Sequence, residues 1–272
     1  MQRLLLLCVL FLASANPFAN ELLEGWSGYD NSNEQSVNHQ PWQRFLDTYL
    51  KTDDFGQTYF AYHRVSQADI GDLSDYINSL ETIDPLALSA DAQKAYWFNL
   101  YNAATVQTVL QAYPVDSIRD IGARLGGLLK TGPWKEPVVT VNGQALSLDD
   151  IEHGIVRPKY QDHRVHYAFN CAAMGCPNLS ATAYTGQNIE SLLAEAEITF
   201  VNHQRGVRFQ GGTLILSKIY DWYRDDFVES ESELPGFLAQ FAEPKLRAQL
   251  NGYRGNIRYE YDWSLNEEPG VR

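Results

Sequence analysis

The sequence predicts a single α+β domain with a helical N-terminal part, two β-hairpins and a small, mainly antiparallel sheet. Several segments repeat apolar residues at helical spacing, and two short segments contain the turn residues of hairpins. The expected order is helices, hairpin, helix, strand, helix, hairpin, helices and strand. Because this order lacks regular βαβ alternation, it favours the α+β class.

The first 15 residues have the pattern of a secretory signal peptide, with cleavage after Ala15. Arg3 precedes an apolar run shorter than the ~20 residues that span a bilayer, and no later segment reaches that length. We therefore expect export to the periplasm or the extracellular space, without membrane insertion after cleavage. Acylation of Cys8 is a weaker alternative, because leucines stand where a small residue should precede such a cysteine.

The mature chain is expected to begin with a flexible or surface-draped arm and to continue as one globular domain. Residues 16–38 are polar and have no sustained period, whereas the periodic segments all lie within residues 39–272. Helices are expected over residues 42–51, 68–83, 90–113 and 188–203. The third has apolar residues on several faces, which is typical of a central buried helix. Its polar residues Asn99, Tyr101 and Asn102 either bind a neighbouring loop or line a site.

The remaining elements follow from turn and cap signals. Hairpins are expected over residues 137–148 and 207–217, with turns at Asn142-Gly143 and Gly211-Gly212. Ser147 should cap a helix that ends at Arg157-Pro158. Residues 164–170 are β-branched and aromatic, and predict a strand that leads into a cysteine-containing loop. Short helices within residues 218–250 and a last strand over residues 257–263 complete the domain.

The charge of the chain restricts its partners. The 34 acidic residues outnumber the 21 basic ones, for a net charge of −13. A field of this sign repels phosphate backbones and anionic membranes, so we expect no nucleic-acid partner. A peptide-like or other small-molecule substrate is compatible with it, and no sequence pattern indicates a cofactor.

The segment HYAFNCAAMGCPNLS, residues 166–180, contains both cysteines of the expected mature chain. A catalytic cysteine needs a nearby imidazole or helix N-terminus to lower its pKa, and a third group to orient the base. For Cys171 the preferred base is His153, which Asp149 can orient from four residues earlier on the same helix. His166 is expected to be a core or supporting residue, because an extended strand would place it about 16 Å from Cys171.

Glu152 is unusual because it falls within the apolar stripe of its predicted helix. A buried carboxylate is costly unless it is paired. Glu152 therefore either forms a structural ion pair with an arginine, such as Arg157 or Arg164, or holds the imidazole of a catalytic group.

Three functions are compatible with these residues. In the first, the protein is an exported cysteine-dependent hydrolase or acyltransferase for an amide, peptide or thioester bond, with Cys171, His153 and Glu152 as catalytic residues. In the second, a Cys171–Cys176 disulfide closes the loop of a non-catalytic binding domain for a peptide or glycan. In the third, His166, Cys171 and Cys176 bind zinc with a fourth ligand such as His153.

Five motifs resemble the domain-of-unknown-function 547 family over about residues 65–265: YWFNLYNA, LSLDDIEHGIVRP, RVHYAFNCAAMGCPNLS, LSKIYDWYRDDF and IRYEYDWSLN. The resemblance maps the Glu-His pair of the family to Glu152 and His153, and its Asn-Cys cysteine to Cys171. Some relatives have no cysteine at the position of Cys176, which favours a role of Cys171 independent of a disulfide. The resemblance also implies a fold similar to papain-like cysteine enzymes, including the phytochelatin synthase group. Two features depart from the papain order: His153 precedes Cys171, and His203, the one histidine after Cys171, is followed by no obvious Asn or Asp partner.

Overall fold

The computed structural model describes residues 21–122 and 131–270. The expected signal peptide over residues 1–15 lies outside these ranges. Within them, no helix combines the length and the apolar character needed to cross a membrane.

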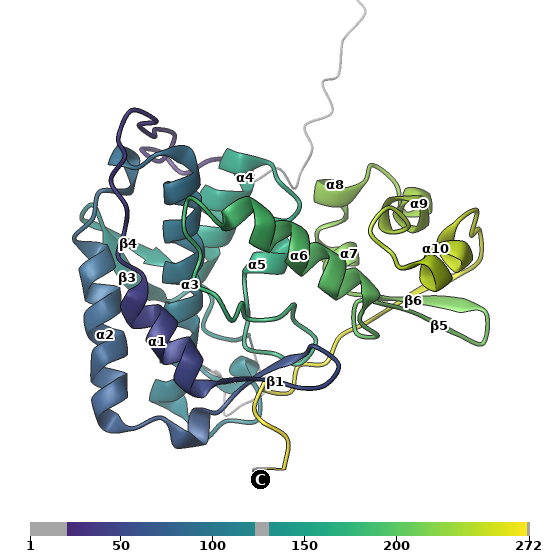
Figure 1. Ribbon diagram of the computed structural model, residues 1–272, viewed down its shortest axis with the longest axis horizontal. Helices are drawn as coiled ribbons and strands as arrows, with labels where there is room; N and C mark the ends of the chain where they lie inside the picture. The colour runs from purple at the N-terminus through teal and green to yellow at the C-terminus, as the bar shows by residue number, and fades with distance from the viewer. Residues whose placement is uncertain (1–20, 123–130, 271–272) are drawn as a thin grey trace, which may run out of the picture.

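The described residues form an α+β fold, as expected (Figure 1). The helices are α1 (Gln40–Tyr49), α2 (Gln67–Glu81), α3 (Ala90–Ala112), α4 (Arg157–Tyr160), α5 (Val165–Ala168), α6 (Ile189–Asn202), α7 (Ile219–Trp222), α8 (Arg224–Phe227), α9 (Leu234–Leu238) and α10 (Pro244–Leu250). The strands are β1 (Leu50–Thr52), β2 (Thr58–Phe60), β3 (Pro137–Val141), β4 (Gln144–Ser147), β5 (Val207–Gln210), β6 (Thr213–Ser217) and β7 (Ile257–Glu260). A π-helical segment, η5 (Asp150–Val156), precedes α4.

Two hydrophobic clusters make up the interior. The larger contains the buried faces of α1, α2 and α3, the β3–β4 hairpin and η5. The smaller contains β5, β6 and the short helices α7 to α10. Helix α6 joins them, because Ile189 and Leu193 pack in the first cluster while Phe200 and Val201 pack in the second. In Figure 1 the long helices accordingly lie on one side and the β5–β6 hairpin with α9 and α10 on the other.

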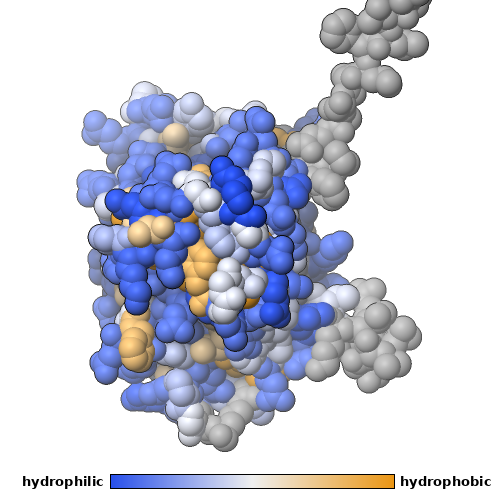
Figure 2. Space-filling view, turned by 90° about the vertical axis from the view of Figure 1, so that its right-hand side faces the viewer, coloured by the Kyte–Doolittle hydropathy of each residue, from blue (hydrophilic) through white to orange (hydrophobic). Residues whose placement is uncertain are grey.

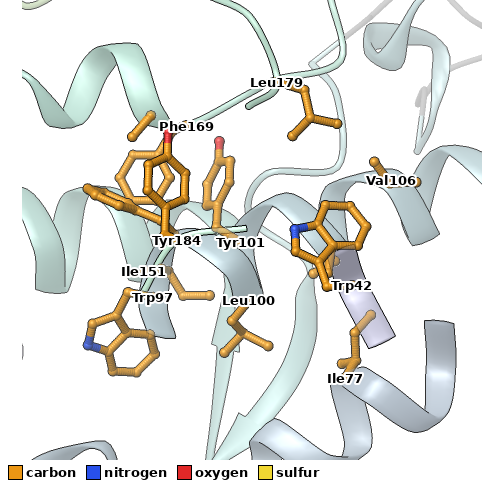
Figure 3. Close-up of a cluster of buried hydrophobic side chains, with 14 of the residues drawn as sticks. Trp42, Ile77, Trp97, Leu100, Tyr101, Val106, Ile151, Phe169, Leu179 and Tyr184 are labelled. Atoms are coloured by element: carbon orange, nitrogen blue, oxygen red, sulfur yellow. The ribbon is translucent and has the colours of Figure 1, made fainter. Parts of the chain in front are cut away.

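Helix α3 is the central helix, as its apolar pattern predicts. It is buried along most of its length, and Figure 3 shows Trp97, Leu100 and Tyr101 of this helix among the other core side chains. Ser89 precedes it as the N-cap residue, although its side chain makes no capping hydrogen bond.

Polar side chains dominate the outer face drawn in Figure 2, where apolar residues form only small patches.

Both predicted hairpins are confirmed. Asn142 and Gly143 have φ values of 50° and 77°, and Gly211 and Gly212 have values of 57° and 82°. These left-handed conformations are those of a two-residue hairpin turn, which Asn and Gly adopt at low cost. Strand β7 pairs with β6 in parallel, so the three-stranded sheet β5–β6–β7 is mixed. The short antiparallel hairpin of β1 and β2 was not predicted from the sequence.

One predicted element and one predicted helix boundary are wrong. Residues 164–170 contain the helical turn α5 and no strand; this turn packs against α6, and Asn102 of α3 donates to the carbonyl of Ala168. The helix after Ser147 continues through Pro158 into α4. Pro158 has no N–H to donate to the carbonyl of Gly154, and the backbone N–H of Leu23 donates to that oxygen instead, at 2.8 Å.

The described part of the N-terminal arm, from residue 21, is draped over the domain and anchored there. Trp26 is buried against Trp97 of α3, with ring centroids 5.3 Å apart. Lys159 donates to the carbonyl oxygens of Trp26 and Gly28 at 2.8 and 2.7 Å. These contacts hold residues 26–28 against the domain, which fits the surface-draped alternative for this segment.

Candidate active site

A cavity of about 260 Å³ lies where the two hydrophobic clusters meet. Tyr101 and Phe169 of the first cluster line it together with Ile219 and Tyr223 of the second. All three residues predicted to be catalytic, Cys171, His153 and Glu152, line the same cavity. The fold therefore brings together side chains from η5, the cysteine loop and the C-terminal segments.

The two cysteines are free thiols in direct contact. The sulfur atoms of Cys171 and Cys176 are 2.8 Å apart, and the backbone N–H of Cys171 donates to the Cys176 sulfur at 3.0 Å. The hydroxyl oxygen of Tyr261 is 2.9 Å from the Cys171 sulfur. Cys176 is buried, whereas Cys171 is partly exposed. Cys171 is therefore the sulfur that a substrate can reach.

Hydrogen bonding makes the two thiols chemically different. The bond that the Cys171 thiol donates to Cys176, together with burial, raises the pKa of Cys171. Burial also opposes ionisation of Cys176, but the two donors of Cys171 outweigh it and lower the pKa of Cys176. Within the pair, negative charge is therefore favoured on the buried sulfur.

Buried amides of α3 hold the cysteine loop in place. The Asn102 side chain donates to the carbonyl of Ala168 at 3.0 Å and accepts from the backbone N–H of Asn170 at 2.9 Å. The Asn170 side chain in turn donates to the carbonyl of Pro177, so both ends of the loop are fixed. Asn99 makes a similar pair of bonds with the backbone of Tyr184. The asparagines are thus loop ties, while Tyr101 lines the cavity.

His153 does not have the geometry of a base for Cys171. Its Nδ1 is 3.1 Å from a guanidinium nitrogen of Arg157, and arginine can only donate, so this Nδ1 accepts. The proton of the neutral ring is then on Nε2, which lies 3.9 Å from Asp149. The predicted Asp149–His153 proximity is present, but the lone pair of His153 is already used.

His166 has the arrangement that was expected of His153. Its Nε2 is 2.6 Å from Oδ2 of Asp226, which also accepts from Arg157 at 2.8 Å. Burial opposes ionisation of Asp226, but these two donors lower its pKa, so the carboxylate accepts and the imidazole donates through Nε2. Burial lowers the pKa of His166, which leaves Nδ1 as a free acceptor. Among the described residues this buried Nδ1 has no hydrogen-bond partner.

Glu152 lies between the two histidines. Its carboxylate accepts from the hydroxyl of Tyr101 at 3.1 Å and lies 3.8 Å from Nδ1 of His153 and 3.9 Å from Nδ1 of His166. It is 8% exposed, and in the described part of the chain no lysine or arginine lies within ion-pair distance of it. The expected structural Glu–Arg pair is therefore not formed, and Glu152 faces the imidazoles.

Aromatic rings make up much of the cavity wall. Trp222, Tyr261 and Trp263 contact one another with ring centroids 4.6 to 5.6 Å apart, and Trp134 packs on Trp263. The ring of Tyr223 stacks on His166 at 4.1 Å with an interplanar angle of 11°. Such walls suit a substrate with an apolar portion.

The sequence did not predict Asp226, Tyr223 and Tyr261 as site residues, although all three lie in motifs that resemble the DUF547 family. The signal in the sequence was the concentration of aromatic and acidic residues in two segments of these motifs, IYDWYRDDF and IRYEYDW. His166 was also predicted to lie outside the site, because a strand was expected where α5 forms. The zinc interpretation gains no support: the described residues contain no group of three or more His, Cys, Asp or Glu side chains that could hold a metal ion.

Residues 85–201 match the family described as "Protein of unknown function, DUF547". This match supports the assignment of residues 85–201 to the DUF547 family. The matched residues include the motifs with Tyr101, Glu152 and Cys171, whereas Asp226 and Tyr261 lie C-terminal to the matched DUF547 region. Comparison with curated proteins and with solved structures found no match. The similarity to papain-like enzymes stays a prediction.

Proposed function

We propose that this DUF547 protein is an exported cysteine-dependent hydrolase or acyltransferase that acts on an amide, peptide or thioester bond. The main support is the meeting of a reachable thiol, Cys171, with an Asp226–His166 pair in one largely apolar cavity. Export rests on the apolar run after Arg3.

In this proposal the sulfur of Cys171 attacks the carbonyl carbon of the substrate and forms an acyl-enzyme. His166, held by Asp226, supplies acid–base chemistry to the leaving group and to the water or acceptor that releases the acyl group. His166 replaces His153 as the expected base, because its Nδ1 is free while that of His153 accepts from Arg157.

A direct test is to look for the acyl-enzyme. The reduced protein is incubated with activated acyl thioesters and anilides, and the Cys171-containing peptide is examined by mass spectrometry for the added acyl group. We expect acylation of Cys171 that is absent in Cys171→Ser and strongly slowed in His166→Asn. The exposed Gln111→Ala on α3 is the control and should be acylated like the wild type. Absence of acylation with both substrate classes, while Cys171 is free and alkylates, would contradict the proposal.

A non-catalytic binding domain closed by a disulfide is the second candidate, and the contact between the two sulfur atoms favours it. It is distinguished by alkylating the protein from its native compartment with and without reductant. If Cys171 and Cys176 are alkylated only after reduction, the result favours the binding domain closed by a disulfide. If Cys171 alkylates without reductant, the nucleophile function is supported.

A further inference from the structure

We propose that Cys176 takes the thiol proton of Cys171 during attack, and that the buried guanidinium of Arg205 is the counter-charge for the Cys176 thiolate. The inference deepens the proposed function, on which it rests for its chemical meaning. In the step, the S–H bond of Cys171 breaks, the proton moves to the Cys176 sulfur, and the freed electron pair of Cys171 forms the bond to the carbonyl carbon.

The contacts of Cys171 point to this acceptor. Its thiol donates to Cys176 across 2.8 Å, and the second close polar atom is the hydroxyl of Tyr261. No hydrogen bond joins Cys171 to His153 or His166 in the described structure. Cys176 therefore touches the reacting sulfur, whereas the histidines only share its cavity.

Arg205 lies behind the loop that holds Cys176. One of its terminal nitrogens donates to the carbonyl of Met174 at 3.3 Å, and the other donates to the side chain of Asn178. These two residues flank Cys176 on either side, so the guanidinium bridges the back of the loop. The charged group also lies over the ring of Phe200, at 5.6 Å.

The charge of Arg205 lacks an ordinary partner. Among the described residues no carboxylate lies within ion-pair distance of it, and its buried Nε has no hydrogen-bond acceptor. A buried charge without a counter-ion is costly. A thiolate at Cys176 would supply that counter-ion, since each group lowers the cost of burying the other.

Other titratable groups also act on the pair. Tyr261 faces both sulfurs, and Glu152 acts on Cys171 across the cavity. Asp53 and Tyr59 act on Arg205 from the β1–β2 side, and His203 lies two residues before it in sequence. None of these is a carboxylate in ion-pair contact with the guanidinium, so Arg205 is the positive group most directly available to the sulfurs.

Titration of the thiolates by their ultraviolet absorbance tests the inference without a substrate, on the expected mature protein from residue 16, which lacks Cys8. In the reduced wild type, two thiols that share one proton should ionise in two separate steps, on either side of the ordinary cysteine pKa of ~8.5. Cys176→Ser should show one step. Two thiols that ionise together near the ordinary value would overturn the inference.

The role of Arg205 is tested in a Cys171→Ser background, where Cys176 is the one thiol of the loop. Arg205→Gln should raise the ionisation midpoint of Cys176 by about one pH unit, a tenfold loss of thiolate, and Arg205→Lys should restore most of it. Arg208→Gln, at an exposed guanidinium on β5, is the control. If Arg205 has only a structural role, Arg205→Gln will lower the unfolding temperature and leave the ionisation midpoint of Cys176 unchanged, which would refute the counter-charge role.

If Arg205→Gln does not fold, the wild-type titration still tests the shared proton, and the midpoint in Arg205→Lys tests the counter-charge. The acylation of Cys171 is measured separately, so failure here does not imply failure of the proposed function.

Discussion

Nε2 of His166 lies 2.6 Å from Oδ2 of Asp226, which is 60 residues further along the chain. This contact fixes which nitrogen of the ring carries the proton and leaves Nδ1 free beside Glu152. In the proposed mechanism this nearly inaccessible histidine exchanges protons with the leaving group and the acyl acceptor, while Cys176 takes the thiol proton of Cys171.

Asp226→Asn should destabilise the protein at neutral pH by about 2 kcal/mol, because it removes the charge from a hydrogen bond to His166 and an ion pair with Arg157. The pKa of Asp226 is well below its ordinary value, so the contribution of its carboxylate is fully present above about pH 4 and decreases as the pH falls further. Urea unfolding at pH values between 7 and 3 should show that the difference in unfolding free energy between wild type and variant becomes smaller at the acidic end. The neighbouring, more exposed Asp225→Asn should change stability by less than about 0.5 kcal/mol. A gap that stays constant with pH would contradict this assignment.

Tyr261→Phe should slow alkylation of Cys171 at pH 8 by about tenfold. The Tyr261 hydroxyl lies 2.9 Å from the sulfur and lowers the pKa of Cys171, so its removal raises that pKa, and one pKa unit corresponds to about a tenfold change in thiolate. The rate is measured with iodoacetamide as a function of pH. Tyr259→Phe, two residues earlier, removes a hydroxyl that contacts Glu231 and is the matched control. Equal rates for the two variants would argue against the hydrogen bond.

Asn102→Ala should lower the free energy of unfolding by about 1–3 kcal/mol, because the carbonyl of Ala168 and the N–H of Asn170 lose their partners in the interior. Because Asn170 begins the cysteine loop, the reactivity of Cys171 should change as well. Denaturant unfolding and alkylation rates measure the two effects. Gln111→Ala at the exposed end of the same helix should leave both unchanged. If stability falls but the reactivity of Cys171 does not change, the hydrogen bonds of Asn102 stabilise the fold without positioning the cysteine.

His39 predicts a pH dependence of stability away from the site. It is 6% exposed and bonded to the hydroxyl of Tyr76, and burial lowers its pKa to about 4. The unfolded chain binds a proton near pH 6.5 and the folded protein does not, so stability is lost as the pH falls from about 6.5 to 4. In urea unfolding, the loss of unfolding free energy over that pH range should be smaller in His39→Gln than in the wild type by about 2–3 kcal/mol. An unchanged slope in His39→Gln, with His63→Gln measured in parallel, would show that other groups cause it.

The sequence predicts most of the elements that depend on local chemistry. The helices α1, α2, α3 and α6 follow from apolar spacing, and both glycine-containing hairpins follow from the left-handed turn conformations that Asn and Gly tolerate. It also identified Cys171 and Glu152, because a cysteine in a loop and a carboxylate in an apolar stripe are conspicuous in sequence alone.

Which side chains meet in the cavity depends on the packing of distant segments. Residues 164–170 have the composition of a strand but form the turn α5, which packs against α6 and belongs to none of the sheets of the described residues. That turn places His166 in the cavity and opposite Asp226. The lone pair of His153 is used by Arg157, a contact that helical spacing permits but cannot require. Local sequence sets the conformation of a segment, whereas the partners of a buried polar group depend on contacts between distant segments, and these arise only when the chain has folded.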